Sequence, residues 1–290
     1  MSQITVGCDP EFFIRDEMGD TVPVCGLIGG TKDHPKPMEG MKEGFFVQED
    51  GAAVEFNIPP AHTPAEFAEN VTSALHNIQS ILTKKKLGAT VLNSLALKND
   101  WTTKFPNLLQ IGCDPDFIAY ESGQYGPEPR VSAPDKVGVI RGAGGHVHVG
   151  YPTDLCPPQI VAQLLDLMLA LPAVPYDKQG QRRQWWGVAG LYRPKSYGIE
   201  YRTLSNWWIW RGGSCLEIAG RSIALIESLQ AHMIQWQAFY DLVNWKSVRD
   251  VIYREDEKAA KTLFNRLMEH KVFADAFHAG NHRALGYKNG

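Results

Sequence analysis

Apolar and polar residues alternate along several short stretches of the chain, the pattern of β-strands with one buried face. Four stretches each carry two polar residues separated by one apolar or aromatic residue: Asp9 and Glu11, Glu55 and Asn57, His146 and His148, and Glu200 and Arg202. In a strand, residues i and i+2 point to the same face, so each pair presents two functional groups side by side. Four such pairs predict a sheet with one polar face, suited to cations and an anionic ligand.

Amphipathic helices are expected between and after these strands. The stretch from Thr63 to Glu66 is a capping box with Pro at the first helical position, which predicts a helix that runs to about Lys86 and stops at Gly88. Further helices are expected to start near Pro157 and to span about 214–243 and 254–270. No linker divides the chain, so the pattern predicts one α+β domain over residues 1–290.

Composition and charge argue against several classes of protein. The formal net charge of −3 and the pI of about 6.3 argue against a general nucleic-acid-binding surface, which would need an excess of basic residues. The longest apolar run, IVAQLLDLMLALPAV, is too short for a membrane span and contains an Asp. The N-terminus lacks a signal-peptide pattern, and five cysteines without a CxxC pair suggest reduced thiols. A cytoplasmic protein is therefore expected.

The polar pairs bring together residue types that require counter-charges. Two carboxylates about 4 Å apart repel by roughly 4 kcal/mol at an effective dielectric near 20, so several together need cations or bound protons. Carboxylate oxygens with an occasional imidazole suit Mg²⁺ or Mn²⁺. Four arginines supply fork-shaped donors for phosphate or carboxylate: Arg182, Arg183, Arg193 and Arg202. Residues 29–32, GGTK, are typical of a backbone anion nest with Lys32 beside it. This combination is typical of phosphoryl transfer.

Each pair also has a simpler interpretation by itself. Asp-x-Glu on a strand is more often a solvated edge, Glu-x-Arg is often a cross-strand ion pair, and His-x-His suits the exposed face of a half-buried strand. Their joint occurrence favours one common site. Residues 111–119, IGCDPDFIA, repeat the opening GCDPEFFI, and the role of Asp114 and Asp116 in that repeat stays open.

The motifs resemble those of a known superfamily. GCDPEFF is similar to the carboxylate strand of glutamine synthetases, GAGGHVHVG to their His-x-His strand, and GIEYR to their Glu-x-Arg strand. GGTK, EDGAAVEFNIPPA, GCDPDF and AGLYRPKSYGIEYRTLSNWW more closely resemble the phage-type carboxylate–amine ligases of the glutamine synthetase/glutamate–cysteine ligase superfamily. The resemblance extends from residue 7 to residue 208, and residues 214–290 match no motif.

The resemblance implies a role for each matching residue. One divalent ion would be bound by Glu11, Glu55 and an acid of the Glu49-Asp50 turn, taken as Asp50. A second ion would be bound by Asp9, His146 and Glu200. The nucleotide would contact His148 and Lys32. The transferred phosphoryl group would be held by Arg202, Arg193 and Arg183, with Arg202, Arg193 and Glu55 as the catalytic residues.

The implied fold is a curved, mostly antiparallel sheet of the glutamine synthetase catalytic-domain type, with a concave polar face and helices on the other side. The implied activity is ATP-dependent amide or peptide bond formation through an acyl phosphate. Its cofactors would be ATP and two or more Mg²⁺ or Mn²⁺ ions, and its partners a small-molecule or peptide carboxylate and an amine. A phage-encoded enzyme acting in the host cytoplasm would fit this branch.

The chain also departs from the superfamily pattern. Asp9 is one methylene shorter than the expected Glu, and Asn57 stands where a second acid would be, which favours a substrate contact over metal ligation. The separate N-terminal sheet domain of glutamine synthetases is missing, which argues against a dodecamer with shared sites and against glutamine synthesis.

Two other functions fit the sequence. A metal-dependent hydrolase using the His-x-His pair would hold a transition metal tightly and act without ATP. A non-catalytic virion or scaffold protein that kept the fold would bind no nucleotide.

Overall fold

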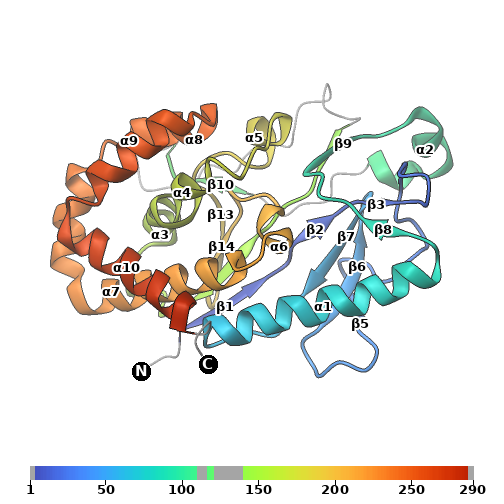
Figure 1. Cartoon of the computed structure of the whole chain (residues 1–290), viewed down its shortest axis with the longest axis horizontal. Helices are drawn as coiled ribbons and strands as arrows, with labels where there is room; N and C mark the ends of the chain where they lie inside the picture. Colours follow the sequence, from blue (N-terminus) through green and yellow to red (C-terminus); the bar gives the residue numbers. More distant parts are fainter. Residues whose placement is uncertain (1–3, 110–115, 121–139, 287–290) are drawn as a thin grey trace.

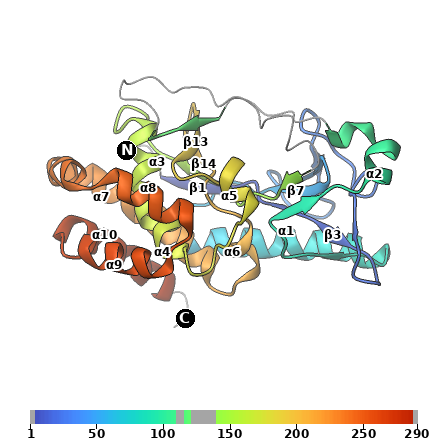
Figure 2. The ribbon, with the colours of Figure 1, turned by 90° about the horizontal axis from the view of Figure 1, so that it is seen from above.

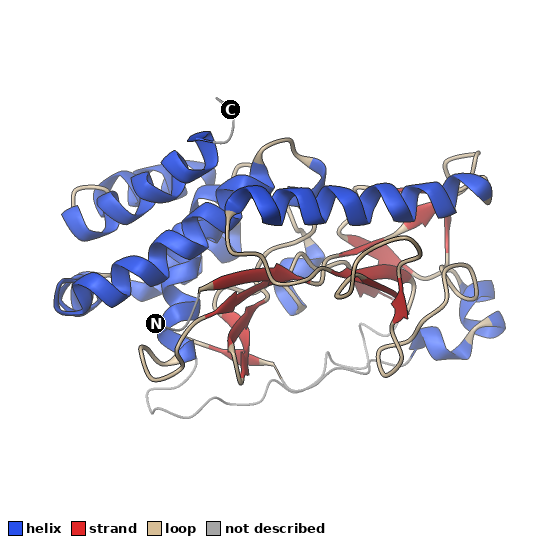
Figure 3. Cartoon of the chain, turned by 90° about the horizontal axis from the view of Figure 1, so that it is seen from below, coloured by secondary structure: helices blue, strands red, loops and turns tan. Residues whose placement is uncertain are grey.

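A computed structural model describes residues 4–109, 116–120 and 140–286 of the chain. It has mixed α+β architecture, and every strand pair in the described ranges is antiparallel. This confirms the α+β class, while the glutamine synthetase-like form of the sheet stays a prediction. The strands gather in the centre of the molecule and the last helices lie at one end (Figure 3).

Two larger sheets carry the sequence motifs. The five-stranded sheet has the order β1 (Thr5–Cys8), β12 (Val147–Gly150), β14 (Gly198–Tyr201), β13 (Leu191–Lys195) and β10 (Phe117–Ile118). The four-stranded sheet has the order β2 (Glu11–Phe12), β7 (Ala53–Asn57), β6 (Phe46–Asp50) and β5 (Lys36–Pro37). Smaller sheets pair β4 (Thr21–Val22), β3 (Ile14–Arg15) and β8 (Gly88–Ala89), and β11 (Ile140–Gly142) with β9 (Ser94–Ala96).

The two larger sheets meet where β1 continues through Asp9 and Pro10 into β2. Phe56 N donates to Pro10 O at 3.3 Å, and Glu11 N donates to Gly144 O at 2.8 Å. The seam therefore has the β7 strand on one side and the segment leading into β12 on the other, with Asp9 between them.

Alternation along these strands divides apolar from polar residues as the sequence predicts. The apolar positions join one buried core: Val6, Cys8, Phe12, Val54, Phe56, Val147, Val149, Ile199 and Tyr201. Helix α1 (Pro64–Lys84) lies along the strands and adds Phe67, Val71, Ala74, Ile78 and Leu82 to that core (Figure 2). Burying a large apolar side chain stabilises a fold by about 1.5–3 kcal/mol, so this one-sided packing fixes which face stays polar.

Helix α1 begins with the expected capping box and ends slightly earlier than expected. Glu66 N donates to Thr63 Oγ1 at 3.1 Å. The last helical residue is Lys84, and Lys86, rather than Gly88, takes the left-handed conformation after it, with φ of 58°.

Helices between and after the strands build the rest of the molecule (Figure 1). They are α2 (Asn99–Lys104), a 3₁₀ turn (Pro106–Leu109), α3 (Pro158–Leu165), a π-helical turn (Asp166–Ala170), α4 (Leu171–Ala173), α5 (Gln181–Trp185), α6 (Trp207–Trp210), α7 (Ser214–Leu242), α8 (Trp245–Arg254), α9 (Glu257–Leu267) and α10 (Lys271–Gly286). Helices α7 and α9 fall within the expected ranges, whereas α8 and α10 were not expected.

Helices α7 and α10 pack at close range through glycines. A Cβ added at Gly220 would lie 2.4 Å from Gly280 O, so the approach needs Gly at this point. In the described part of the chain no helix combines the length and apolar character needed to cross a bilayer. Cys8, Cys156 and Cys215 are free thiols, and Cys113 lies outside the described residues.

Candidate active site

Strand register brings the polar residues of β12, β13 and β14 into one row. His148 pairs with Glu200, and Glu200 pairs with Arg193 on its other side. Residues directly opposite each other in antiparallel strands share a face. The three side chains therefore lie on one face of the five-stranded sheet.

A matching row crosses the four-stranded sheet. Glu55 of β7 pairs with Glu11 of β2 and with Gln48 of β6. Gln48 is buried and was not expected at the site, although its spacing of two from Asp50 places both on the face of Glu55. Asn57 lies two pairs further along, opposite Phe46, and its proposed substrate contact stays a prediction.

The first candidate metal group consists of Glu11, Asp50 and Glu55, whose ligand oxygens lie within 4.8 Å of one another. Burial, followed by the nearby Asp50 charge, raises the pKa of Glu11 to about 7. Burial, followed by the charges of Asp9 and Glu11, raises the pKa of Glu55 well above its usual value. A divalent ion between these carboxylates would supply the missing counter-charge.

The second candidate metal group consists of Asp9, His148 and Glu200, again within 4.8 Å. Asp9 Oδ1 lies 3.1 Å from His148 Nε2 and 3.2 Å from His146 Nδ1. Burial opposes ionisation of Asp9, but above all the charge of His148, together with its hydrogen bond, holds the pKa of Asp9 well below its usual value. This group is therefore anionic at Asp9 and suited to a cation.

The two histidines differ from the roles implied by the resemblance. His146 Nδ1 lies 3.1 Å from Arg202 Nη1, which donates to it, and burial followed by the Arg202 charge lowers the pKa of His146 to about 4. His146 is thus a neutral acceptor for an arginine, and His148 completes the three-residue group. Tyr197, not singled out from sequence, stacks on His148 and its hydroxyl lies 2.8 Å from His148 Nδ1.

Glu200 is the centre of charge of the site. Its side chain is 1% exposed, and it forms ion pairs with Arg202, Arg193 at 3.4 Å and Lys195 at 2.8 Å. Burial alone would raise its pKa, but Arg202 above all lowers it to about 2. Lys195 was missed in the sequence, although it lies two residues beyond Arg193 on the same strand face.

Asp116, from the repeated GCDPDF motif, joins the site. Its Oδ1 lies 2.7 Å from Arg193 Nε and 3.1 Å from Arg202 Nε. Asp116 therefore bridges the two arginines expected to hold a phosphoryl group. This contact gives Asp116, whose role the sequence left open, a place in the site. Asp114 lies outside the described residues.

Arg183 does not join this cluster. Its guanidinium donates to Gly187 O and Thr203 O and pairs with Asp177 and Glu255, all away from the two acid groups. These contacts do not support the expectation that Arg183 binds the phosphoryl group, which stays a prediction. The adjacent Arg182 does act on the first acid group, because its charge lowers the pKa of Glu11.

The expected anion nest is filled by the chain itself. Glu49 accepts hydrogen bonds at 2.8 Å from the backbone N–H groups of Gly26, Ile28 and Gly29. The loop before Lys32 is thus closed by an internal carboxylate and is not free for a nucleotide. The charge of Lys32 acts instead on Asp50, where it opposes the rise in the pKa of that carboxyl.

The different environments of Glu49 and Asp50 give a first prediction. We expect Glu49→Ala to lower the free energy of unfolding by about 2 kcal/mol, since it leaves partly buried N–H donors without an acceptor, and to leave Mn²⁺ affinity unchanged. Asp50→Ala should do the reverse, weakening Mn²⁺ binding at least tenfold with little loss of stability. Urea unfolding and Mn²⁺ titration followed by electron paramagnetic resonance measure both quantities. Equal effects of the two variants on Mn²⁺ binding would contradict these roles.

Two clusters of carboxylates, one of them beside paired arginines, define an α+β protein whose candidate site combines acidic and basic side chains on antiparallel strands. Residues 141–283 match the family model described as Phage phiEco32-like COOH.NH2 ligase-type 2, so this part of the chain is similar to the carboxylate–amine ligases of that family. The match includes His148, Glu200 and Arg202 and also the C-terminal helices, for which the sequence offered no motif. A search of curated proteins found no match.

Proposed function

We propose that this protein is an ATP-dependent ligase that joins a carboxylate to an amine through an acyl phosphate. The observation that carries the proposal is the arrangement of the Asp9–His148–Glu200 and Glu11–Asp50–Glu55 groups around one seam, with Arg193 and Arg202 beside Glu200. The match to the ligase family model supports carbon–nitrogen bond formation, and the nucleotide and the mechanism are the proposed part.

The residues present fit divalent ions. The pKa of Asp9 is held well below its usual value beside His148, whereas the pKa of Glu11 and of Glu55 is raised by burial and like charge. Mg²⁺ bound by the two groups would neutralise the triphosphate and align its γ-phosphate. We therefore propose two ions, with Asp9, His148 and Glu200 around one and Glu11, Asp50 and Glu55 around the other.

Arg193 and Arg202 are proposed to hold the transferred phosphoryl group. Arg193 Nη2 is buried and has no hydrogen-bond partner among described residues, so it is available to an anion. In the proposed reaction, a substrate carboxylate oxygen attacks the γ-phosphorus, the bond to the β,γ-bridging oxygen breaks, and ADP leaves. The amine nitrogen then attacks the acyl carbon, the carbon–oxygen bond to phosphate breaks, and the amine proton passes to solvent or a nearby base. Fixed guanidinium groups stabilise the charge that develops in both steps.

Incubation with ATP, Mg²⁺ and pools of carboxylates and amines tests the proposal. We expect ADP release that requires both an acid and an amine, with one phosphate and one amide formed per ADP. An amide product formed without nucleotide consumption, or no ADP release with any pool, would contradict it.

The hydrolase alternative receives less support from the geometry. Arg202 donates to His146 Nδ1 at 3.1 Å, which takes that nitrogen away from a metal chelated by both histidines. Elemental analysis of the purified protein separates the two functions, because the hydrolase would retain a stoichiometric transition metal. The scaffold alternative is tested by a thermal-shift scan with ATP and Mg²⁺, since a ligand that binds only the folded state raises its stability.

A further inference from the structure

The segment that follows Arg202 ties the two candidate metal groups together. Gly145 N donates to Leu204 O at 3.0 Å, and Asn206 Nδ2 donates to the backbone oxygen of Glu11 at 3.0 Å. Ser205 also forms a β-bridge with Gly144. A shift of residues 203–206 would therefore move Arg202, the entry to β12 and Glu11 together.

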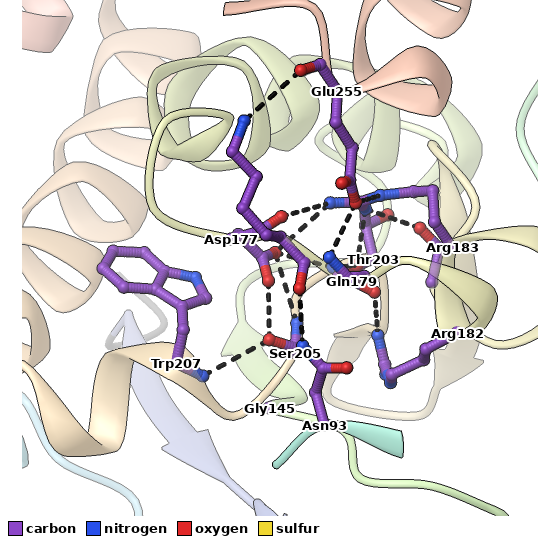
Figure 4. A network of polar contacts seen from close by, with 12 residues as sticks. Asn93, Gly145, Asp177, Gln179, Arg182, Arg183, Thr203, Ser205, Trp207 and Glu255 are labelled. Carbon is purple, nitrogen blue, oxygen red and sulfur yellow. Dashed lines mark hydrogen bonds and ion pairs between the residues drawn. The ribbon is translucent and has the colours of Figure 1, made fainter. Parts of the chain in front are cut away.

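Behind this segment lies a buried polar network (Figure 4). Asp177, 1% exposed, accepts from Ser205 Oγ at 2.5 Å and from Gln179 Nε2 at 2.6 Å. Gln179 Nε2 also donates to Thr203 O at 2.9 Å, and Arg183 Nη1 donates to the same oxygen at 3.1 Å. These contacts hold residues 203–205 through side chains that belong to neither acid group.

Glu255, between α8 and α9, reaches into this network from the C-terminal helices. Its Oε1 accepts from Gln179 N at 2.7 Å and lies 3.5 Å from Arg183 Nε. Arg183 is only 2% exposed, so its charge depends on Asp177 and Glu255 for compensation.

The backbone of Glu255 is in the left-handed region, with φ of 52° and ψ of 36°, where a helix end usually has Gly or Asn. Within the described residues, Lys86 is the other non-glycine residue with positive φ, at 58°. Lys86 has a side chain that is 75% exposed, whereas that of Glu255 is 17% exposed and points into the network. Glu255 keeps an unfavourable backbone conformation while its carboxylate is bound in the network. This combination indicates that the carboxylate has a functional role.

We propose that Glu255 is a positioning residue, through which helices α8 and α9 fix the 203–206 segment and thereby the arginine and acid groups. The kinetic consequence rests on the proposed ligase function, whereas the positioning itself does not. This gives the C-terminal helices, which matched no sequence motif, a part in the site.

The test compares Glu255→Gly with Lys86→Gly. Both substitutions relieve a left-handed backbone conformation in the same way, so they differ in the side chain that is lost. We expect hydrogen exchange at the amides of Gly145 and Ser205 to accelerate at least tenfold in Glu255→Gly and to stay unchanged in Lys86→Gly. Unchanged exchange at both amides in a folded Glu255→Gly protein would overturn the proposal.

Glu255→Gln keeps an acceptor for Gln179 N but removes the charge beside Arg183. We expect Glu255→Gln to give a smaller acceleration of exchange at the same two amides. If Glu255→Gly does not fold, Glu255→Gln becomes the test, and exchange at the wild-type rate in this variant would overturn the proposal. In the ligase assay, Glu255→Gly should lower kcat at least tenfold, and Lys86→Gly should leave it unchanged. If the wild type shows no ATP-dependent ligation, the proposed function fails, but the exchange result still tests the positioning role.

Discussion

Replacing Glu200 by Gln should reduce ligation by about 10²–10³-fold, the loss typical of removing one preorganised electrostatic contact. Glu200 is buried, pairs with Arg193, Arg202 and Lys195, and contributes an oxygen to the group formed with Asp9 and His148. The neutral amide leaves three cations without their shared carboxylate and takes a charged ligand from the cation site. Steady-state amide formation with saturating ATP and Mg²⁺ measures the loss.

Glu227→Gln is the matched control for this variant. Glu227 undergoes the same chemical change but pairs with Arg283 at the surface, with 41% of its side chain exposed. Turnover should stay within a factor of two of the wild type, since surface ion pairs contribute little. A folded Glu200→Gln protein that ligates as fast as Glu227→Gln would remove Glu200 from the mechanism.

Mg²⁺ should raise the melting temperature, and the rise should grow as the pH increases from 5 to 8. The pKa of Glu11 is raised from 4.5 to about 7 by burial and by Asp50, so the group contributes stability that is fully present below pH 4.5 and is lost as pH rises through 7. The difference of roughly 2.5 pKa units corresponds to about 3 kcal/mol lost from the metal-free protein by neutral pH. A divalent ion offsets this loss because it favours the ionised carboxylates.

The same coupling predicts proton release. Calorimetric titration with Mn²⁺ near pH 6.5, in buffers of different ionisation enthalpy, should show protons released on binding, and Glu11→Gln should reduce their number. Melting temperatures that rise equally with Mg²⁺ at pH 5 and pH 8, with no protons released, would contradict binding at these carboxylates.

Strand periodicity is what made most of the site predictable. The spacing of two in Asp-x-Glu, His-x-His and Glu-x-Arg sets a common face, and antiparallel register then aligns His148, Glu200 and Arg193. The same rule would have separated Glu49 from Asp50, because β6 continues to Asp50 and adjacent strand residues point to opposite faces. Treating the two residues as a turn lost that information.

Other parts of the site depend on tertiary packing that no local pattern reports. Arg182 and Arg183 are adjacent on α5, where successive side chains diverge by about 100°, so the pattern could not tell which faces the carboxylates. Tyr197 reaches His148 because the turn between β13 and β14 places it there, and Asp116 reaches Arg193 across the pairing of β10 with β13. Helix α8 was missed although it is amphipathic and is capped by Asn244, whereas α10 has a weaker apolar periodicity.

Anomalous diffraction from crystals grown with Mn²⁺ and a non-hydrolysable ATP analogue tests the central claim most directly. Two manganese peaks are expected, one among Asp9, His148 and Glu200 and one among Glu11, Asp50 and Glu55, with the γ-phosphate against Arg193 and Arg202. Manganese bound at other residues, or a nucleotide whose phosphates lie away from both carboxylate groups, would contradict the account.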